Sequence, residues 1–443
     1  MLLVLDIDCL HSLVLSKVSS PNSNPNGSIL DLPGFGDVSC IANAEDVTAT
    51  IGYSLEKSVN YFMQHELDMK EALKRLRSKA QGHLPPSVSL SDILSRSGLI
   101  CDCPTDVIPR SFRTDGQLGR KDIRIGRSTA TVKLELGRGA YGIVALLDAK
   151  EGDECIAVKA QRPPGCLAWE YEVMRKIEER LGDRLDTRLQ AFPKAFSFVA
   201  LADGALLGMS AASSSGLNLV DLVNIYKVRL GETVPEIIAL HFVSIMLTTL
   251  ELMHWHGKVL HCDTKPDNWV LCDSAGAGHP CQGSDLMLVD FGRAVDLETI
   301  RRQGSSAMET KLSGHATTKD MMCVAMRLGR PWSFDVDTFG VCAAAHVLLF
   351  GQHLEIKKKA GDNRWAPTLS IPKDFQKDVW DYFFDSLLNI DDMTHAAIGS
   401  HPQSVKTLRC RIDDSLRDRR GELIEALQRQ ATILPLCRDE IAT

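Results

Sequence analysis

The chain has 443 residues, of which 44% are hydrophobic and 24% charged, and its formal net charge is −7. This composition suits a globular protein with a two-lobed domain and an extension, and it excludes a chain that is disordered throughout. The acidic balance, with a pI near 6.0, argues against a dedicated binder of nucleic acid or of anionic membranes.

Cysteine spacing and apolar runs indicate the compartment. The 13 cysteines are scattered, and the close pair Cys101 and Cys103 lacks the spacing and the second pair of a zinc site, so we expect a reducing compartment. The apolar opening MLLVLDIDCLHSLVL carries Asp6 and Asp8 without a basic region, which makes it a poor signal peptide. We find no stretch near the ~18 to 20 apolar residues of a membrane span, so the sequence predicts a soluble intracellular protein.

Residues 1–95 are expected to form a separate N-terminal segment. The run SSPNSNPNGS at 19–28 has the composition of a turn or linker. Residues 54–80 have apolar side chains at helical spacing among Glu, Lys and Arg, which predicts one amphipathic helix or two. We detect no internal repeat of the kind that builds solenoids.

Short β-rich runs begin at about residue 131 and predict an antiparallel meander. Helical spacing follows, including a long apolar helix with Pro at its start and Gly at its end. This order predicts an α+β fold with a small β lobe and a larger helical lobe. The expected strands are 131–139, 141–149, 155–161, 259–263, 268–272 and 286–292, and the expected helices are 170–181, 235–257 and 340–350.

Gly137, Gly139, Gly142 and Val144 form a G-x-G-x-x-G-x-V pattern. Glycines let a backbone turn approach phosphate oxygens closely. Alone the pattern is weak, since a structural hairpin or a dinucleotide-binding turn has similar glycines. In a dinucleotide site a helix follows the glycines directly, whereas in this chain a predicted strand follows them. This order favours a hairpin that covers a bound nucleotide.

Ala157-Val158-Lys159 lies in the next apolar strand, where a Lys can pair with the α- and β-phosphates of a nucleotide. The alternative is an edge-strand Lys that extends to water. A phosphate-binding Lys expects a Glu on the following helix, and we select Glu170. The other candidates, expected on solvated faces, are Glu172, Glu178 and Glu179.

The stretch VLHCDTKPDNWVL, residues 259–271, supplies Asp263 as a candidate base and Lys265 as a candidate charge stabiliser. Asn268 and Asp290, the latter in Asp-Phe-Gly, supply oxygens that suit Mg²⁺. We expect His261 to brace the loop. Each motif alone has a structural explanation, but their order along the chain favours phosphoryl transfer.

These motifs together resemble the eukaryotic protein kinase superfamily, in its serine/threonine branch. Small-molecule phosphotransferases of the aminoglycoside and choline type share part of the pattern, but they usually lack a Lys at the position of Lys265. The resemblance implies that ATP and Mg²⁺ are the cofactors. It also implies that Ala157 and Glu170 belong to the nucleotide site.

Further stretches resemble the spindle-assembly-checkpoint kinases named for budding uninhibited by benzimidazole. The resemblance covers roughly residues 96–432. It implies an extension at 96–130 packed on the kinase, a kinase domain at 131–432 with lobes at 131–212 and 213–432, and a tail at 433–443. The matching stretches are 108–119, 169–170, 224–227, 261–268, 290–296, 329–332, 336–341, 349–351 and 383–390.

The resemblance implies a role at kinetochores and centromeres in mitosis, in a protein of the nucleus and cytoplasm, with checkpoint proteins as partners and a histone tail as the substrate. Asp337 is expected in a helix that anchors the catalytic loop. No Ala-Pro-Glu closes the activation segment, which runs through 317–332, so substrate docking should differ from that of ordinary kinases. The family's tetratricopeptide-like N-terminal domain is not found, so we expect a kinase-only relative or a piece of a longer protein.

Cys262 stands where most protein kinases carry an Arg that pairs with a phosphate on the activation loop. A Cys is at most a weak neutral donor. We therefore expect the activation segment to be ordered by its own packing or by the segment before the β lobe. Two alternatives to an active protein kinase stay open: a catalytically weak checkpoint scaffold, because checkpoint relatives include pseudokinases, and a small-molecule phosphotransferase.

Overall fold

The computed structural model describes most of the predicted kinase region and one helix before it. All described residues lie in one compact unit, Ala49–Thr443. The expected linker at 19–28 lies outside them, as do Gly139, Cys101 and Cys103. The described residues are 58–79, 99–100, 121–125, 128–138, 142–147, 156–161, 165–182, 191–200, 205–213, 215–272, 285–301, 307–316, 319–390 and 403–441.

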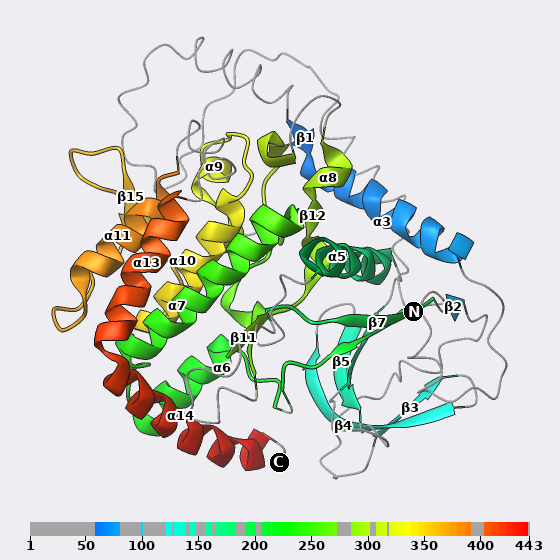
Figure 1. The fold of residues 1–443 in the computed structure, drawn as a ribbon, viewed down its shortest axis with the longest axis horizontal. Coiled ribbons are helices and arrows are strands. Elements are labelled where there is room, and N and C mark those ends of the chain that lie inside the picture. Colours follow the sequence, from blue (N-terminus) through cyan, green and yellow to red (C-terminus); the bar gives the residue numbers. More distant parts are fainter. Residues whose placement is uncertain are drawn as a thin grey trace, which may run out of the picture. The chain divides into compact units, whose positions relative to one another are not determined.

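The small lobe contains a seven-stranded sheet in the order β2-β7-β8-β6-β5-β4-β3 (Figure 1). The predicted antiparallel meander is confirmed for β4, β5 and β6. Two strands that were not predicted, β8 and β7, continue the antiparallel pairing beyond β6. Two strands from the 96–130 stretch pair with the edges, β3 antiparallel to β4 and β2 parallel to β7. The strands are β2 (Leu99–Ile100), β3 (Lys121–Ile125), β4 (Ser128–Arg138), β5 (Gly142–Leu147), β6 (Ile156–Gln161), β7 (Ala195–Ala200) and β8 (Ala205–Ser210).

Two helices pack side by side next to the sheet, α5 (Gly165–Leu181) and α3 (Tyr61–Lys79) (Figure 1). α3 is the amphipathic helix expected within 54–80, and it buries Ala72 and Leu76, which lie four residues apart on one face. Just before α3, β1 (Val59–Asn60) pairs in parallel with β13 (Leu312–Ser313). The N-terminal segment is therefore joined to the middle of the helical lobe.

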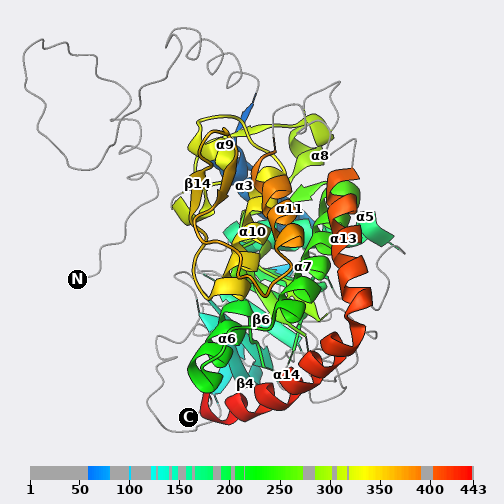
Figure 2. The same cartoon turned by 90° about the vertical axis from the view of Figure 1, so that its left-hand side faces the viewer.

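In the helical lobe, α7 (Glu236–Glu251) lies between α10 (Asp335–Phe350) and α13 (Gln403–Asp418) (Figures 1 and 2). α7 continues as a π-helical turn to Gly257, and together they are long and apolar enough to span a membrane, contrary to the sequence-based expectation. Because 72% of its most apolar window is buried in the protein, we interpret this helix as a core helix. The other helices are α6 (Leu219–Asn224), α8 (Leu297–Ile300), α9 (Val324–Arg327), α11 (Lys377–Leu388) and α14 (Arg420–Ile441), which runs through the expected boundary at 432.

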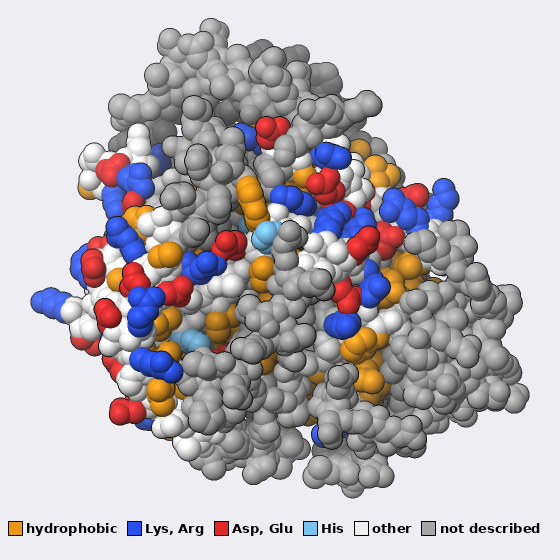
Figure 3. Space-filling model, in the orientation of Figure 1, with side chains coloured by type: hydrophobic (Ala, Val, Ile, Leu, Met, Phe, Trp, Pro, Cys, Tyr) orange, Lys and Arg blue, Asp and Glu red, His pale blue; other side chains and the backbone are white. Residues whose placement is uncertain are grey.

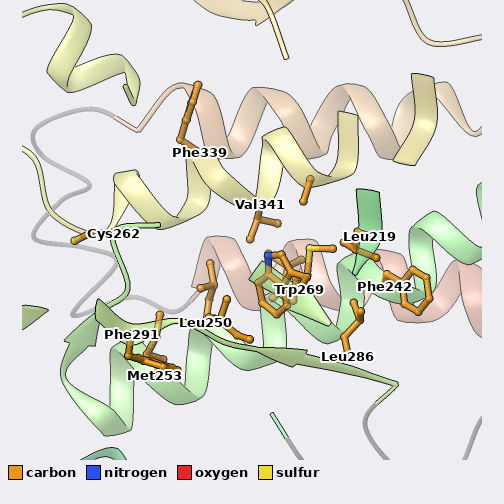
Figure 4. Close-up of a cluster of buried hydrophobic side chains, with 14 of the residues drawn as sticks. Leu219, Phe242, Leu250, Met253, Cys262, Trp269, Leu286, Phe291, Phe339 and Val341 are labelled. Carbon is orange, nitrogen blue, oxygen red and sulfur yellow. The ribbon is translucent and has the colours of Figure 1, made fainter. Parts of the chain in front are cut away.

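The core of the helical lobe reaches the loop of residues 261–268, which carries the candidate base. Figure 4 shows Trp269 between side chains of the surrounding helices, with Val341 of α10 above it. Trp269 is fully buried, and its indole Nε1 donates a hydrogen bond to the Thr264 carbonyl oxygen at 3.3 Å. Apolar packing around one side chain therefore restrains the loop that carries the candidate base.

Candidate active site

The catalytic loop, residues 261–268, lies between the short strands β9 (Val259–Leu260) and β10 (Trp269–Leu271). The buried Asp337 carboxylate of α10 accepts hydrogen bonds from the backbone N–H groups of His261 and Cys262, both at 2.8 Å. It also lies 2.9 Å from His254 Nε2. Cys262 has a φ of 61°, a left-handed conformation that costs free energy in a non-glycine residue and is held here by this carboxylate. The expected anchoring role of Asp337 is confirmed.

The three polar side chains of the loop lie close together. Lys265 Nζ is 3.4 Å from Asp263 Oδ2, and Asn268 Nδ2 donates to the Asp263 carbonyl oxygen at 2.7 Å. Asp263 is buried, and its Oδ1 has no hydrogen-bond partner among the described residues. Burial raises the pKa of Asp263, and the Lys265 ammonium opposes this rise. A buried acceptor oxygen with no donor is suited to a substrate hydroxyl.

Lys159 on β6 joins two carboxylates that are far apart in sequence. Its Nζ lies 2.8 Å from Glu170 Oε2 and 2.8 Å from Asp290 Oδ1. Burial would lower the pKa of Lys159, but the two carboxylates outweigh this effect and raise it. Burial would likewise raise the pKa of Asp290, yet Lys159 lowers it to about 2. Both groups are therefore charged at neutral pH.

The alternative glutamates on α5 lie away from Lys159: Glu179 is exposed as expected, whereas Glu172, expected on a solvated face, is only 12% exposed because α3 covers it. Glu172 lies 3.6 Å from Arg75 of α3. Glu178 pairs with Arg175 and Lys194 near the surface. Among the candidates, Glu170 is the one that the structure brings to Lys159.

The described glycines of the pattern, Gly137 and Gly142, lie on the antiparallel strands β4 and β5, in which Gly137 pairs with Val144. A Cβ on Gly137 would meet nothing within 4 Å, whereas a Cβ on Gly142 would lie 2.2 Å from the Ala160 carbonyl oxygen of β6. Close strand packing therefore explains Gly142 without any nucleotide. Val144 is half-buried and lies opposite Lys159 in the β5–β6 ladder, and Ala157 is buried on β6.

Asp290 begins the Asp-Phe-Gly turn in a left-handed conformation, with φ 69°. Phe291 is buried against the His261 ring, with centroids 4.7 Å apart, so His261 braces the loop as expected. The Val289 N–H donates to the Asn268 carbonyl oxygen at 2.9 Å, which places Asp290 beside Asn268.

The described residues contain no group of three or more His, Cys, Asp or Glu that could hold a metal ion. Asp290 and Asn268 nevertheless fit Mg²⁺, which takes one or two protein oxygens and completes its shell with phosphates and water. The Asn268 amide nitrogen is engaged with the Asp263 carbonyl, so its amide oxygen is the atom left for such a ligand.

The motif-based prediction did not include the packing of α3 on the site. The Tyr61 hydroxyl donates to the Arg293 carbonyl oxygen at 3.0 Å, and its ring packs edge-on against Trp332 with centroids 5.3 Å apart. Burial raises the pKa of the Tyr61 phenol well above its ordinary value, so the hydroxyl stays protonated and can donate this hydrogen bond. An aromatic ring from the N-terminal segment therefore packs on the chain after the Asp-Phe-Gly turn and on Trp332. No sequence motif pointed to this contact.

Comparisons with known proteins show what this chain is similar to. No protein-family model matches the chain. The mitotic checkpoint serine/threonine-protein kinase BUB1 of Arabidopsis thaliana is 31% identical over 284 residues, which cover 61% of this chain and 51% of that protein. The protein of the same name from Mus musculus is 28% identical over 62% of this chain and 25% of that protein. The chain thus spans about half of the plant relative and a quarter of the mouse relative.

Among solved structures, the BubR1 kinase domain superposes with a TM-score of 0.65 and 20% identity, covering 88% of this chain and 98% of that domain. This likeness shows the fold, which is that of a protein kinase. The predicted fold class and the resemblance to spindle-checkpoint kinases are both confirmed.

Proposed function

Because the chain resembles the BUB1-type mitotic checkpoint kinases, we propose that it is a protein kinase that uses ATP and Mg²⁺ to phosphorylate Ser or Thr in proteins. One observation carries the proposal: Lys159 is held at 2.8 Å by both Glu170 and Asp290. A kinase requires the strand Lys and the helix Glu to be paired, and this pair is formed here.

Each residue of the site then has a role in the transfer. Gly137, Gly139 and Gly142, with Val144 and Ala157, would enclose the nucleotide beneath the hairpin. Lys159, kept in place by Glu170, would bind the α- and β-phosphates. Asn268 and Asp290 would hold Mg²⁺, which when bound neutralises charge on the phosphate oxygens.

The reaction itself needs a base and a fixed charge. Asp263 would accept the proton of the substrate hydroxyl as its oxygen bonds to the γ-phosphorus and the bond to the ADP oxygen breaks. Lys265 would stabilise the negative charge on the transferred group. The raised pKa of Asp263 makes it a stronger base than an exposed Asp.

In the cell, we place this activity in the mitotic spindle checkpoint and chromosome segregation, at kinetochores and centromeres, with a histone tail as a possible substrate. The name of the relatives supports the checkpoint role, whereas the location and the histone substrate rest on the family resemblance of the sequence motifs. On the face drawn in Figure 3, acidic and basic side chains are interspersed over the described surface. Such a mixed charge distribution suits binding to proteins better than direct binding to a nucleic acid backbone, which favours a basic surface.

The test is phosphate transfer from labelled ATP with Mg²⁺ to nucleosomes or to the protein itself. Asp263→Asn should lower kcat by about 10²- to 10⁴-fold, the contribution of a positioned base. Lys159→Met should lose activity, whereas Lys194→Met, a surface lysine with 63% of its side chain exposed, should keep it. Equal labelling by the wild type and Lys159→Met would refute the proposal. Transfer to sugars or amines but not to protein would instead support the small-molecule alternative.

A further inference from the structure

One face of α5 follows the chain segment after the Asp-Phe-Gly turn. Trp169, Lys176 and Arg180 are spaced by seven and then four residues, so they share a face of the helix. Trp169 Nε1 donates to the Ala294 carbonyl oxygen at 2.7 Å. Further along the same face of α5, Lys176 and Arg180 both donate hydrogen bonds to the carboxylate of Asp296.

Asp296 is fully buried and its two oxygens have five hydrogen-bond donors. Oδ1 accepts from Arg180 Nη1 at 2.7 Å and from the Glu298 N–H at 3.1 Å. Oδ2 accepts from Lys176 Nζ at 2.8 Å, Arg180 Nη2 at 3.0 Å and Thr299 Oγ1 at 2.6 Å. Both oxygens thus engage the guanidinium, a geometry in which charge and direction both matter.

The same carboxylate is tied to the catalytic loop. Asp296 lies on β12 (Val295–Asp296), which is antiparallel to β9 and pairs Asp296 with Val259, two residues before His261. Arg180 Nη1 also donates to the Gly257 carbonyl oxygen at 2.7 Å, just before β9. Asp296 therefore connects three parts that must be aligned for catalysis: α5 with Glu170, the segment after Asp290, and the entry to the catalytic loop.

Burial alone would raise the pKa of Asp296, but the hydrogen bonds from Arg180 and Lys176 dominate and lower it to about 2. The carboxylate is therefore ionised at every physiological pH. Cys262, by contrast, offers no charge to an activation-loop phosphate.

We propose that Asp296 is a positioning residue that holds α5 where Glu170 meets Lys159, and that its carboxylate replaces the phosphate by which other kinases order these parts. The inference rests on the proposed kinase function, in which the pair of Lys159 and Glu170 must be formed. It predicts an enzyme that is active without phosphorylation of its activation segment, because the required negative charge is part of the chain.

The test compares Asp296→Asn, which keeps the shape and removes the charge, with Asp385→Asn. Asp385 is a matched control, because it also pairs with an Arg and a Lys, Arg364 and Lys359, but lies on α11 in the helical lobe. Asp296→Asn should lower kcat/KM for ATP by about 10- to 100-fold, because displaced reacting groups lose rate steeply. It should also speed amide hydrogen exchange in α5, while Asp385→Asn should change neither quantity.

A second arm uses Arg180→Gln and the double variant with Asp296→Asn. If the two residues act as one unit, the double variant should lose little more activity than either single variant. If Asp296→Asn fails to fold, Arg180→Gln alone still tests the role, because it removes the guanidinium that holds both oxygens of Asp296, and it should lower kcat/KM and speed exchange in α5. Phosphatase treatment should leave wild-type activity unchanged.

Several results would overturn the inference. The first is that the wild type is active and Asp296→Asn has the same kcat, KM and amide exchange in α5. The second is that the activity losses of the two single variants add fully in the double variant. The third is that the wild type loses activity after phosphatase treatment. A wild type that transfers no phosphate would refute the proposed function instead. Hydrogen exchange and nucleotide affinity would then still test Asp296, since both can be measured without turnover, and unchanged values in Asp296→Asn would reject its positioning role.

Discussion

A single methyl group added at Gly340 of α10 should lower kcat strongly while it lowers the stability of the fold only modestly. A Cβ built there would lie 2.0 Å from Thr264 Oγ1 and 2.8 Å from the Thr264 carbonyl oxygen. Thr264 directly follows Asp263, and its hydroxyl donates to the Asp337 carbonyl oxygen at 3.0 Å. Gly340→Ala must therefore push the catalytic loop away from the helix that anchors it.

The magnitude follows from opposing terms. In a helix, Gly→Ala is worth about 1 kcal/mol in favour of folding. Overpacking opposes it by about 1 to 3 kcal/mol, and a lost hydrogen bond from Thr264 adds about 1 kcal/mol. We expect a net loss of roughly 1 to 3 kcal/mol in the free energy of unfolding. A shift of about 1 Å at Asp263 should lower kcat about 100-fold.

Two measurements on each variant test this reasoning: denaturant unfolding, and phosphate transfer at saturating ATP. Gly421→Ala is the matched control, because Gly421 is also helical and a Cβ there would meet nothing within 4 Å. It should keep full activity and change stability by no more than about 1 kcal/mol. Thr264→Ala combined with Gly340→Ala should recover part of the lost activity, because the shortest clash is removed. Wild-type kcat and stability in Gly340→Ala would show that the loop is not held against α10 as described.

Three further predictions concern charge and packing. Lys265→Ala should move the acid limb of the kcat/KM profile to higher pH, because the ammonium lowers the pKa of Asp263; an unmoved midpoint would contradict the assigned interaction. Asp296, whose folded pKa of about 2 lies below the unfolded value of ~3.9, should contribute roughly 2 to 3 kcal/mol at neutral pH. This contribution is present above the unfolded pKa and is lost as pH falls from about 4 to 2, so the stability difference between the wild type and Asp296→Asn should shrink over that range. Tyr61→Ala should weaken the packing of α3 by roughly 1 to 3 kcal/mol and expose residues 58–76 to proteolysis; equal cleavage rates would argue against that contact.

Much of the fold could be predicted because its signals are local. Short β-rich runs identified β5 and β6, and helical spacing identified α5 and α3, since that period reports which side of a helix is buried. The order of the motifs predicted a protein kinase fold, which the likeness to a solved kinase domain confirms. Element ends differed by a few residues: α5 starts at Gly165, before the expected 170.

The amino-acid sequence by itself determined the elements, the chemistry available at the site and the kinase resemblance. Contacts between distant segments decided the rest. Lys159 and Asp290 are 131 residues apart, and Tyr61 and Arg293 are 232 residues apart. No local period encodes such pairs, so the packed chain is needed to show that the selected Glu170 meets Lys159. It also explains Gly142 by the closeness of β6 and gathers Lys176 and Arg180 around Asp296. The sequence supplies the candidate reacting groups, and tertiary packing decides which charged side chains hold these groups in position.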